Sequence, residues 1–209
     1  MPRLRPLHAL WLPLALAAAG AATSSPAQTA DKPRIAVGDQ WTYRQVDKDG
    51  KEVTWGRKVL SIDGDGGFTV ATAPDKTMRF DASWNFIDPR GGEFSRPAYR
   101  FPMQVGAEWS FVAKQMLQTN LVDQRNQYRI VGYEPLTVPA GTFDCFKAEG
   151  TADTTYKNSY NRRMKEAWWY CPRVNAIAKF VRDTTTTTRE SGASHERVES
   201  VLVRFTPGR

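Results

Sequence analysis

Apolar and polar residues alternate along most of the chain after residue 36, and no segment there carries a sustained helical stripe. This period of two is typical of half-buried β-strands. The predicted strands cover residues 41–44, 52–62, 68–73, 77–81, 174–188 and 196–205, with two more inside 117–133 on either side of a polar bend at 120–126. Turn signals such as Asp49-Gly50 separate neighbouring strands. The pattern therefore predicts an all-β antiparallel meander.

The stretch from Val138 to Pro172 is expected to form one long hairpin with its turn at Tyr156–Tyr160. Placing Cys145 opposite Cys171 gives this hairpin a single apolar face, which consists of Phe146, Ala148, Ala152, Met164, Trp168 and Tyr170. On the other face Asp153 meets Arg163, Lys147 meets Trp169, and Glu149 lies diagonal to Lys165. Opposite charges and a cation–aromatic pair favour this register.

Residues 83–102 break the alternation. They contain three prolines, a glycine pair and five aromatic residues, so a loop or edge connection is expected there rather than a central strand. An aromatic loop over a sheet is a candidate ligand-binding segment. Its candidate binding residues are Trp84, Phe86, Phe94, Tyr99 and Phe101. The alternative is a loop whose aromatic side chains only cover one end of the core.

Two short segments share the pattern V-G-x-x-W-[ST]-aromatic. They are Val37–Tyr43 and Val105–Phe111. In each, the glycine suits a turn, and the tryptophan and the second aromatic residue share one face of the strand that follows. The pattern predicts two similar strand-starting units, although a common local way of entering a strand would look alike.

Residues 1–27 have the anatomy of a secretory signal peptide. Arg3 and Arg5 precede a short apolar run at 10–19, and small residues follow it. The run is too short to span a membrane, and a retained membrane anchor is the alternative. Cleavage is expected between residues 22 and 30, which leaves 31–209 as a single antiparallel β domain. That domain is expected to be periplasmic or secreted and not to span the membrane.

An exported chain with two cysteines in a plausible register predicts a disulfide between Cys145 and Cys171. Two unpaired buried thiols are the alternative. A redox role would need a more closely spaced pair. His195 is the one histidine after the signal peptide, and it is expected in a solvated turn. Too few soft ligands remain for a zinc site.

Catalytic and cofactor motifs are missing from the sequence. It contains no P-loop, no G-x-G-x-x-G and no G-x-S-x-G. The acidic, glycine-rich stretch at 63–67 lacks the distal glutamate of a calcium loop and is expected to be a plain hairpin turn. Glu149 and Glu166 fall on opposite faces of the long hairpin, which argues against a paired-carboxylate site. No metal, no cofactor and no enzymatic activity are therefore expected, with an unrecognised hydrolase as an alternative.

The net charge and its distribution along the chain indicate which classes of binding partner the protein suits. Residues 1–30 hold two of the 29 lysines and arginines and none of the 22 acidic residues, so the rest of the chain has a net charge of +5. The basic residues are scattered rather than clustered, and the chain is predicted to be exported, so nucleic acid is not an expected partner. An anionic lipid surface or an acidic glycan would suit this charge, which ordinary solvated proteins also carry.

The motifs VPAGTF at 138–143 and WYCP at 169–172, with the two V-G-x-x-W segments, resemble a family of exported bacterial proteins of unknown function. Such families resemble curved antiparallel half-barrels of the lipoprotein-carrier type, whose concave face holds acyl chains. The resemblance implies a curved sheet, a half-barrel or open barrel, with at most short helical pieces. It covers most of the chain after the signal peptide, and its motifs are structural.

The expected function is that of a periplasmic, non-enzymatic binding protein with a lipid or another hydrophobic small molecule in a β groove. The alternative is a protein–protein module of the cell envelope, in which an exposed edge such as 183–188 accepts a strand from an envelope protein.

Overall fold

The computed structural model describes residues 28–47, 49–117, 119–157 and 159–208. These residues form an 11-stranded sheet and a separate two-stranded ribbon. The sheet contains β2 (Gln40–Val46), β3 (Glu52–Ile62), β4 (Phe68–Ala73), β5 (Lys76–Phe80), β6 (Phe86–Ile87), β8 (Glu108–Leu117), β9 (Asn120–Val138), β10 (Gly141–Tyr156), β11 (Tyr160–Cys171), β12 (Ala176–Thr188) and β13 (Gly192–Thr206). The ribbon pairs β1 (Thr29–Ala30) with β7 (Met103–Gln104). Two single-turn 3-10 helices, η1 (Gly92–Phe94) and η2 (Pro172–Val174), complete the described elements. The predicted signal peptide lies outside the described residues.

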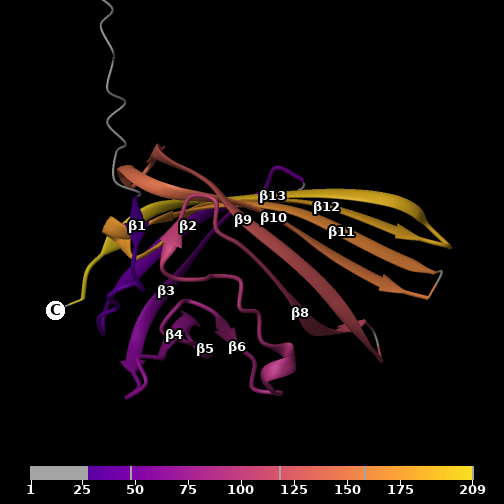
Figure 1. Cartoon of the computed structure of the whole chain (residues 1–209), viewed down its shortest axis with the longest axis horizontal. Helices are drawn as coiled ribbons and strands as arrows, with labels where there is room; N and C mark the ends of the chain where they lie inside the picture. Colours follow the sequence, from indigo (N-terminus) through magenta and orange to yellow (C-terminus); the bar gives the residue numbers. More distant parts are fainter. Residues whose placement is uncertain (1–27, 48, 118, 158, 209) are drawn as a thin grey trace, which may run out of the picture.

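Two antiparallel meanders meet side by side in the sheet. One runs from β2 to β6 and the other from β8 to β13, and they join where β2 pairs with β13. Strands β6 and β8 are the two edges, and within the described chain they do not pair with each other. The sheet arches over the segment that connects them (Figure 1). The predicted fold, a curved antiparallel half-barrel with only short helical pieces, is confirmed.

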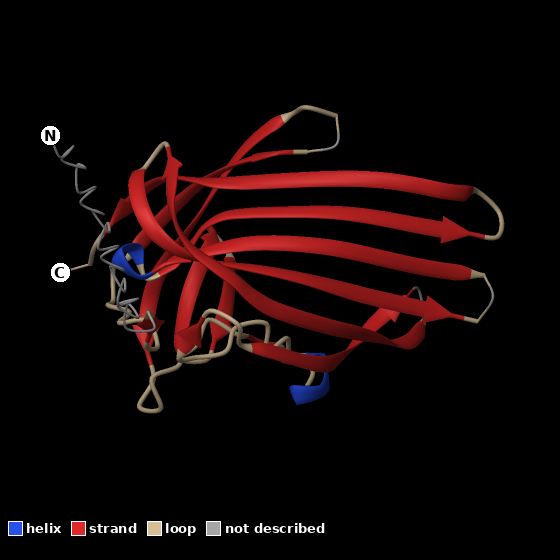
Figure 2. Cartoon of the chain, turned by 45° about the horizontal axis from the view of Figure 1, so that its top comes forward, coloured by secondary structure: helices blue, strands red, loops and turns tan. Residues whose placement is uncertain are grey.

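β-Bulges interrupt the ladders on both sides of the sheet. Register shifts occur in the pairings of β3 with β4, β4 with β5, β9 with β10, β11 with β12, and β13 with β2. An extra residue in one strand bends it and increases its twist. The bulges therefore help to curve a sheet of long strands, whose far ends at β10–β13 project beyond the rest of the molecule (Figure 2).

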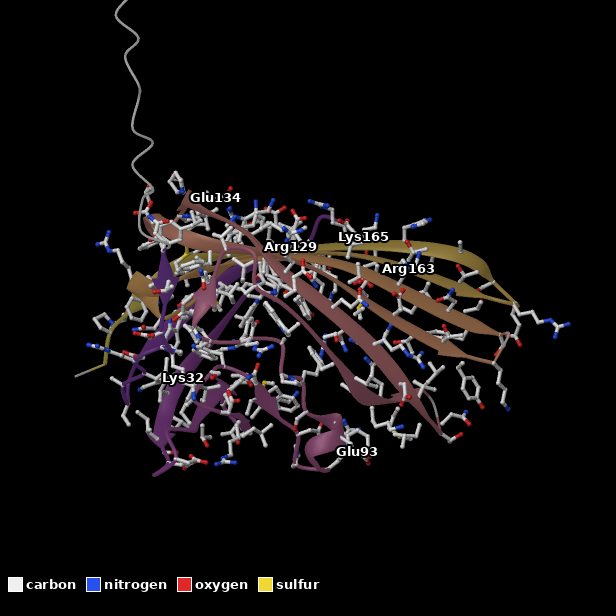
Figure 3. All side chains as sticks on the ribbon, viewed as in Figure 1. Lys32, Glu93, Arg129, Glu134, Arg163 and Lys165 are labelled. Atoms are coloured by element: carbon white, nitrogen blue, oxygen red, sulfur yellow. A yellow bond between two sulfur atoms is a disulfide. The ribbon has the colours of Figure 1, made fainter. Side chains whose placement is uncertain are left out.

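The concave face carries the core. One cluster of buried side chains surrounds Trp41, Phe68 and Trp84, and a second surrounds Phe146 and Trp168. The opposite face is charged: Arg129, Arg163 and Lys165 project from the outer surface of the sheet (Figure 3). Within the described residues, no helix has the length and apolar character needed to cross a membrane.

The long hairpin has the predicted register. Phe146 pairs with Tyr170, Ala148 with Trp168, and Ala152 with Met164, and all six side chains are buried. Cys145 and Cys171 form the predicted disulfide. On the outer face Asp153 Oδ1 lies 2.8 Å from Arg163 Nε, and Lys147 Nζ lies 5.5 Å from the centre of the Trp169 ring. Glu149 forms its ion pair with Lys147, at 2.8 Å, rather than with the diagonal Lys165.

The predicted polar bend at 120–126 is wrong. Strand β8 ends at Leu117, and β9 begins at Asn120 and continues unbroken to Val138. The polar residues that suggested a bend, Gln124 and Asn126, point inward and are fully buried, with Gln124 Nε2 donating to Asn126 Oδ1 at 2.7 Å. A buried polar pair that satisfies part of its own hydrogen-bonding needs can lie within a strand, and the local pattern does not show this.

The predicted edge at 183–188 is also wrong. Each of these residues of β12 pairs with β11 on one side and with β13 on the other. The threonine run is therefore an inner strand near the far end of the sheet, where little else covers it. Its polar, β-branched composition fits a solvated sheet surface as well as it fits an edge. His195 pairs with Thr185 there and is exposed, but it lies on β13 rather than in a turn.

The two V-G-x-x-W segments have the same hydrogen-bond geometry. The amide of Gly38 donates to Val59 O and the amide of Val59 donates back to Asp39 O, at 3.0 and 2.9 Å. The amide of Gly106 donates to Ile130 O and the amide of Ile130 donates back to Ala107 O, at 2.8 and 2.9 Å. Both glycines have a φ of 90°, in the region that favours glycine. Two similar strand-starting turns are therefore present.

Candidate functional site

A cavity of about 320 Å³ lies on the concave side of the half-barrel. Its walls come from three parts of the chain: the meander β2–β6, the connecting segment after β6, and strands β9 and β11–β13. The aromatic wall consists of Tyr43, Trp55, Phe80, Trp84, Phe86, Tyr99, Tyr128, Trp168 and Phe180. Concave, mostly aromatic cavities with a few polar groups are the usual form of small-molecule sites.

The connecting segment is fixed over the cavity by the side chains of Asp81 and Asn85. Asp81 Oδ1 accepts from the amides of Ser83 and Asn85 at 2.8 and 2.9 Å. Asn85 then bridges to Tyr99, because its Nδ2 donates to Tyr99 O at 3.1 Å and its Oδ1 accepts from the Tyr99 amide at 2.7 Å. Asn85, directly before β6, therefore holds the later part of the connecting segment, at Tyr99, next to the cavity.

Trp84 has a left-handed backbone conformation, with a φ of 64°. This conformation is costly for a bulky side chain, so the surroundings must impose it. The indole Nε1 donates to Asn175 O at 2.7 Å, and the ring makes edge contacts with Trp41 and Phe68 at centroid distances of 5.2 and 4.7 Å. Trp84 thus ties the β2–β6 meander to the turn after β11 and presents its ring to the cavity.

The five aromatic residues that the sequence proposes for ligand binding do not all lie at the cavity. Trp84, Phe86 and Tyr99 line the cavity. Phe94, in η1, lies under the guanidinium of Arg90, with 4.3 Å from Arg90 Cζ to the ring centre. Phe101 packs edge-on against Tyr170 at 5.1 Å, in the second core cluster. The structure therefore brings three of the five together and places the other two elsewhere.

A buried carboxylate, Glu166, faces the cavity from β11. Tyr128, Gly150, Glu166 and Arg182 form one cross-strand row on the concave face. Gly150 has no side chain, so the ring of Tyr128 lies over it, and the phenol donates to Glu166 Oε2 at 2.5 Å. On the other side, Arg182 Nη1 lies 3.7 Å from Glu166 Oε1. Burial and the Glu166 carboxylate raise the pKa of Tyr128 well above its ordinary value, so its hydroxyl keeps the proton that it donates.

Two further arginines, Arg57 and Arg96, line the cavity without a carboxylate partner. Among the residues that the structure describes, neither forms an ion pair. The guanidinium of Arg57 lies beside the rings of Trp55, Phe80 and Trp84, with Cζ-to-centre distances of 5.2, 5.2 and 5.4 Å. Aromatic faces attract a guanidinium but do not neutralise its charge. The charge of Arg57 therefore remains uncompensated inside an aromatic cavity.

The sequence analysis did not predict Arg57, Arg96 or Glu166 as cavity residues. The positions of Arg57 and Glu166 in their strands nevertheless indicate that both side chains point to the inner face. Arg57 alternates with Trp55 and Val59 in β3, which places it on the inner face of that strand. Glu166 occupies an even position on the long hairpin, among the apolar face. In contrast, Arg96 lies in an irregular segment, where no periodicity assigns a direction to its side chain. Glu149 is on the opposite face from Glu166, as expected.

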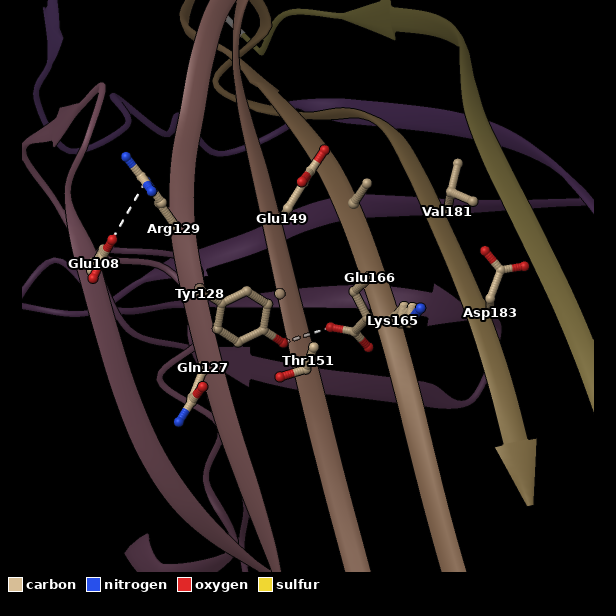
Figure 4. A pocket seen from close by; sticks show the side chains of 12 residues that line it. Glu108, Gln127, Tyr128, Arg129, Glu149, Thr151, Lys165, Glu166, Val181 and Asp183 are labelled. Atoms are coloured by element: carbon tan, nitrogen blue, oxygen red, sulfur yellow. Dashed lines mark hydrogen bonds and ion pairs between the residues drawn. The ribbon is translucent and has the colours of Figure 1, made fainter. Parts of the chain in front are cut away.

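A second hollow lies on the outer face of the sheet, over the same row of strands (Figure 4). It is lined by charged side chains, including Glu149, Lys165 and Asp183. Its volume of about 540 Å³ exceeds that of the concave cavity, and it is more open to solvent. Half of its lining residues are charged, several of them form ion pairs such as Arg129 Nε to Glu108 Oε1 at 3.4 Å, and Tyr128 is the one aromatic residue among those that line it. The concave cavity is therefore the better candidate site.

The fold and the cavity together define an open antiparallel half-barrel with an aromatic, arginine-bearing interior. No protein-family model matches the sequence, and no curated protein matches it. Several solved structures are similar, among them the following three. A protein described as exported, with a YmcC-like fold, from Bacteroides fragilis is 15% identical, covers 85% of this chain and 99% of its own, and has a TM-score of 0.41.

The second structure, described as a lipoprotein from Parabacteroides distasonis, is 14% identical, covers 86% of this chain and 100% of its own, and has a TM-score of 0.49. The third, the hypothetical lipoprotein YmcC from Escherichia coli, is 10% identical, covers 80% of this chain and 85% of its own, and has a TM-score of 0.43.

Proposed function

We propose that this protein is an exported, non-enzymatic binding protein that holds a small hydrophobic molecule in the concave cavity. The observation that carries the proposal is the cavity itself. Its volume of about 320 Å³ lies at the lower end of the range of about 300–1,000 Å³ for small-molecule sites, and nine of its 19 lining residues are aromatic. Apolar surface of this kind gains free energy when a ligand displaces water from it.

Two further observations support the proposal. The disulfide at Cys145–Cys171 is typical of proteins from oxidising compartments, as the signal-peptide pattern also predicts. The one carboxylate among the described lining residues, Glu166, is bound by Tyr128 and Arg182 on its two oxygens. A carboxylate in that arrangement is held in place as a structural anion rather than presented to a substrate as a base.

The experiment uses the full chain, exported by its own N-terminal segment in a bacterial host and purified without detergent. Native mass spectrometry looks for a bound small molecule, and the neutral fluorophore N-phenylnaphthylamine reports on apolar binding. We expect saturable fluorescence enhancement with one site. Ala98→Phe, which places a ring in the cavity, should abolish most of it, whereas Ala193→Phe on the exposed part of β13 should not. Equal binding by both variants, or none by the unmodified protein, would contradict the proposal.

A second candidate function is strand addition at the edge strand β8. This strand is the last in the sheet, and it exposes the apolar side chains of Val112 and Met116, 55% and 50% accessible. An open edge with apolar side chains can accept an extended segment of an envelope protein. A photo-crosslinking residue at Val112 should then capture one protein partner in cells, and the same residue at Thr186 on the inner strand β12 should not. Absence of a specific adduct at Val112 would remove this candidate.

A further inference from the structure

The chemical character of the cavity indicates which hydrophobic molecules it suits. Three guanidinium groups, those of Arg57, Arg96 and Arg182, line it against one carboxylate. That carboxylate is already engaged by Tyr128 and Arg182. Two positive charges therefore remain without a counter-ion among the described residues. Unpaired charge in a partly desolvated site is unfavourable, and an anion from outside would offset that cost.

Unpaired N–H donors around the cavity also favour an anionic ligand. Four N–H groups have no acceptor among the described residues: Nε of Arg57, Nε of Arg96, and the indole Nε1 of Trp55 and of Trp168. All four belong to residues that line the cavity. These N–H groups are themselves buried, so they add a positive potential to the adjoining cavity rather than direct contacts to its contents. That potential favours oxyanions over cations and over ligands that only donate hydrogen bonds.

Arg57 and Arg96 act on the same part of the cavity. Both line the cavity beside Tyr99. Burial raises the pKa of Tyr99, the charge of Arg57 opposes this shift, the Glu166 carboxylate adds to it, and the charge of Arg96 opposes it. Both arginine side chains are only partly buried, so their outer nitrogens can reach a ligand. Guanidinium groups bind carboxylates and phosphates through paired hydrogen bonds, which a point charge such as an ammonium cannot reproduce.

A polar hollow adjoins the cavity, and its position indicates which end of a bound ligand would carry the charge. This hollow shares Phe86, Arg96 and Arg182 with the cavity and adds the basic residues Arg90, Lys114 and Arg162 against one acid, Asp88, which pairs with Arg90 at 2.7 Å. Arg96 and Arg182 thus lie where an aromatic space meets a basic one. This arrangement suits a molecule with an apolar body and one charged end. The small volume suits a single chain better than a two-chain lipid.

We propose, on the basis of the binding function above, that the ligand is a single-chain amphiphile with an oxyanion head group, a carboxylate or a phosphate. The guanidinium groups of Arg57 and Arg96 hold the head group, and the apolar tail lies against the aromatic wall. Arg182 contributes less, because Glu166 already offsets its charge.

Three probes with the same twelve-carbon tail test this proposal by isothermal titration calorimetry: dodecanoate, dodecyl phosphate and 1-dodecanol. We expect at least one of the two anions to bind the unmodified protein about 10- to 100-fold more tightly than the alcohol, the range for charge-assisted hydrogen bonds. The anion that binds more tightly identifies the head group. Equal affinity for the alcohol and both anions would overturn the anionic head group but leave the binding function standing. Failure of all three probes and of N-phenylnaphthylamine would overturn both.

Variants then locate the head group. Arg57→Gln and Arg96→Gln should each weaken anion binding about tenfold, the double variant should remove the preference over the alcohol, and binding of 1-dodecanol should change little. Arg129→Gln is the matched control, because Arg129 lies on the outer face with Glu108. Retained binding of N-phenylnaphthylamine shows that a variant is folded. If Arg57→Gln does not fold, Arg96→Gln alone decides the assignment. Unchanged anion affinity in a folded Arg96→Gln variant would overturn it.

Discussion

Gly150 shows how one residue without a side chain arranges the floor of the cavity. A Cβ atom at this position would lie 2.2 and 2.4 Å from two ring carbons of Tyr128. The ring occupies that space, and only from there does its hydroxyl reach Glu166 on the next strand but one. A strand glycine is usually unfavourable, and here the close approach of the neighbouring ring explains it. The position of Tyr128, and through it the orientation of Glu166, depends on this glycine.

Gly150→Ala is therefore expected to destabilise the protein by about 2 kcal/mol or more, because the ring of Tyr128 must move away and leave Glu166 without its donor. Urea denaturation measures the change in the free energy of unfolding. Gly132→Ala in β9 is the control, since the nearest atom to its added Cβ is Glu134 Oε2 at 3.9 Å. A similar small effect for both substitutions would contradict this account of Gly150.

At the scale of elements, the hairpin β10–β11 is cross-linked by the disulfide and is paired on both sides, with β9 and with β12. Its disulfide lies at the end where β11 leads into η2, and the segment from η2 to the start of β12 accepts hydrogen bonds from the β2–β6 meander. Trp41 Nε1 donates to Val174 O at 2.8 Å, and Tyr43 Oη donates to Ile177 O at 3.0 Å. The disulfide thus lies next to the segment that the β2–β6 meander contacts through these two hydrogen bonds. The hairpin contributes both to the core and to the position of the cavity wall.

Replacement of both cysteines by alanine should lower the free energy of unfolding by about 2–4 kcal/mol, because the unfolded chain gains the entropy of an open loop between two residues 26 apart. Urea denaturation under oxidising conditions compares the two proteins. With a reducing agent present, the unmodified protein should lose a similar amount and the double variant almost nothing. A difference between the proteins that persists after reduction would show that packing, rather than the cross-link, is responsible.

At the scale of the whole molecule, the concave face combines one extended sheet with a dense set of buried phenols. Burial is the largest cause of a raised pKa for Tyr43, Tyr99, Tyr128 and Tyr170. A raised pKa means that the folded protein keeps these protons at a pH where the unfolded chain has lost them. Their stabilising contribution is complete below the ordinary tyrosine pKa of about 10 and is lost as the pH rises above it.

The free energy of unfolding should therefore fall between about pH 10 and pH 11, with each such tyrosine contributing up to about 1.4 kcal/mol per pH unit. Urea titrations at intervals across this range measure the slope. Tyr170→Phe, which removes a phenol whose pKa is raised by burial alone, should flatten the slope by about one such contribution. A stability that stays constant from pH 9 to pH 11 would contradict the protonated, buried state of these side chains.

The sequence by itself determined the strands and the long hairpin. Alternation with a period of two placed β3 and β4 at the observed residues, and the charges and cysteines of residues 138–172 specified one register, including the disulfide. These features follow from neighbouring positions and from one local pairing, which a sequence records directly. Three aromatic residues of the cavity were identified in the same way, from the composition of a single segment.

Only the tertiary structure decided the order of the strands and the contents of the cavity. Strand β12 is inside the sheet rather than at its edge because β13 returns beside it, and a polar threonine run looks the same in either place. Arg57, Arg96 and Glu166 come from three distant parts of the chain and meet only because the sheet curves and the segment after β6 crosses its concave side. Such contacts depend on long-range pairing and on bulges that bend strands, and neither leaves a periodic trace in the sequence.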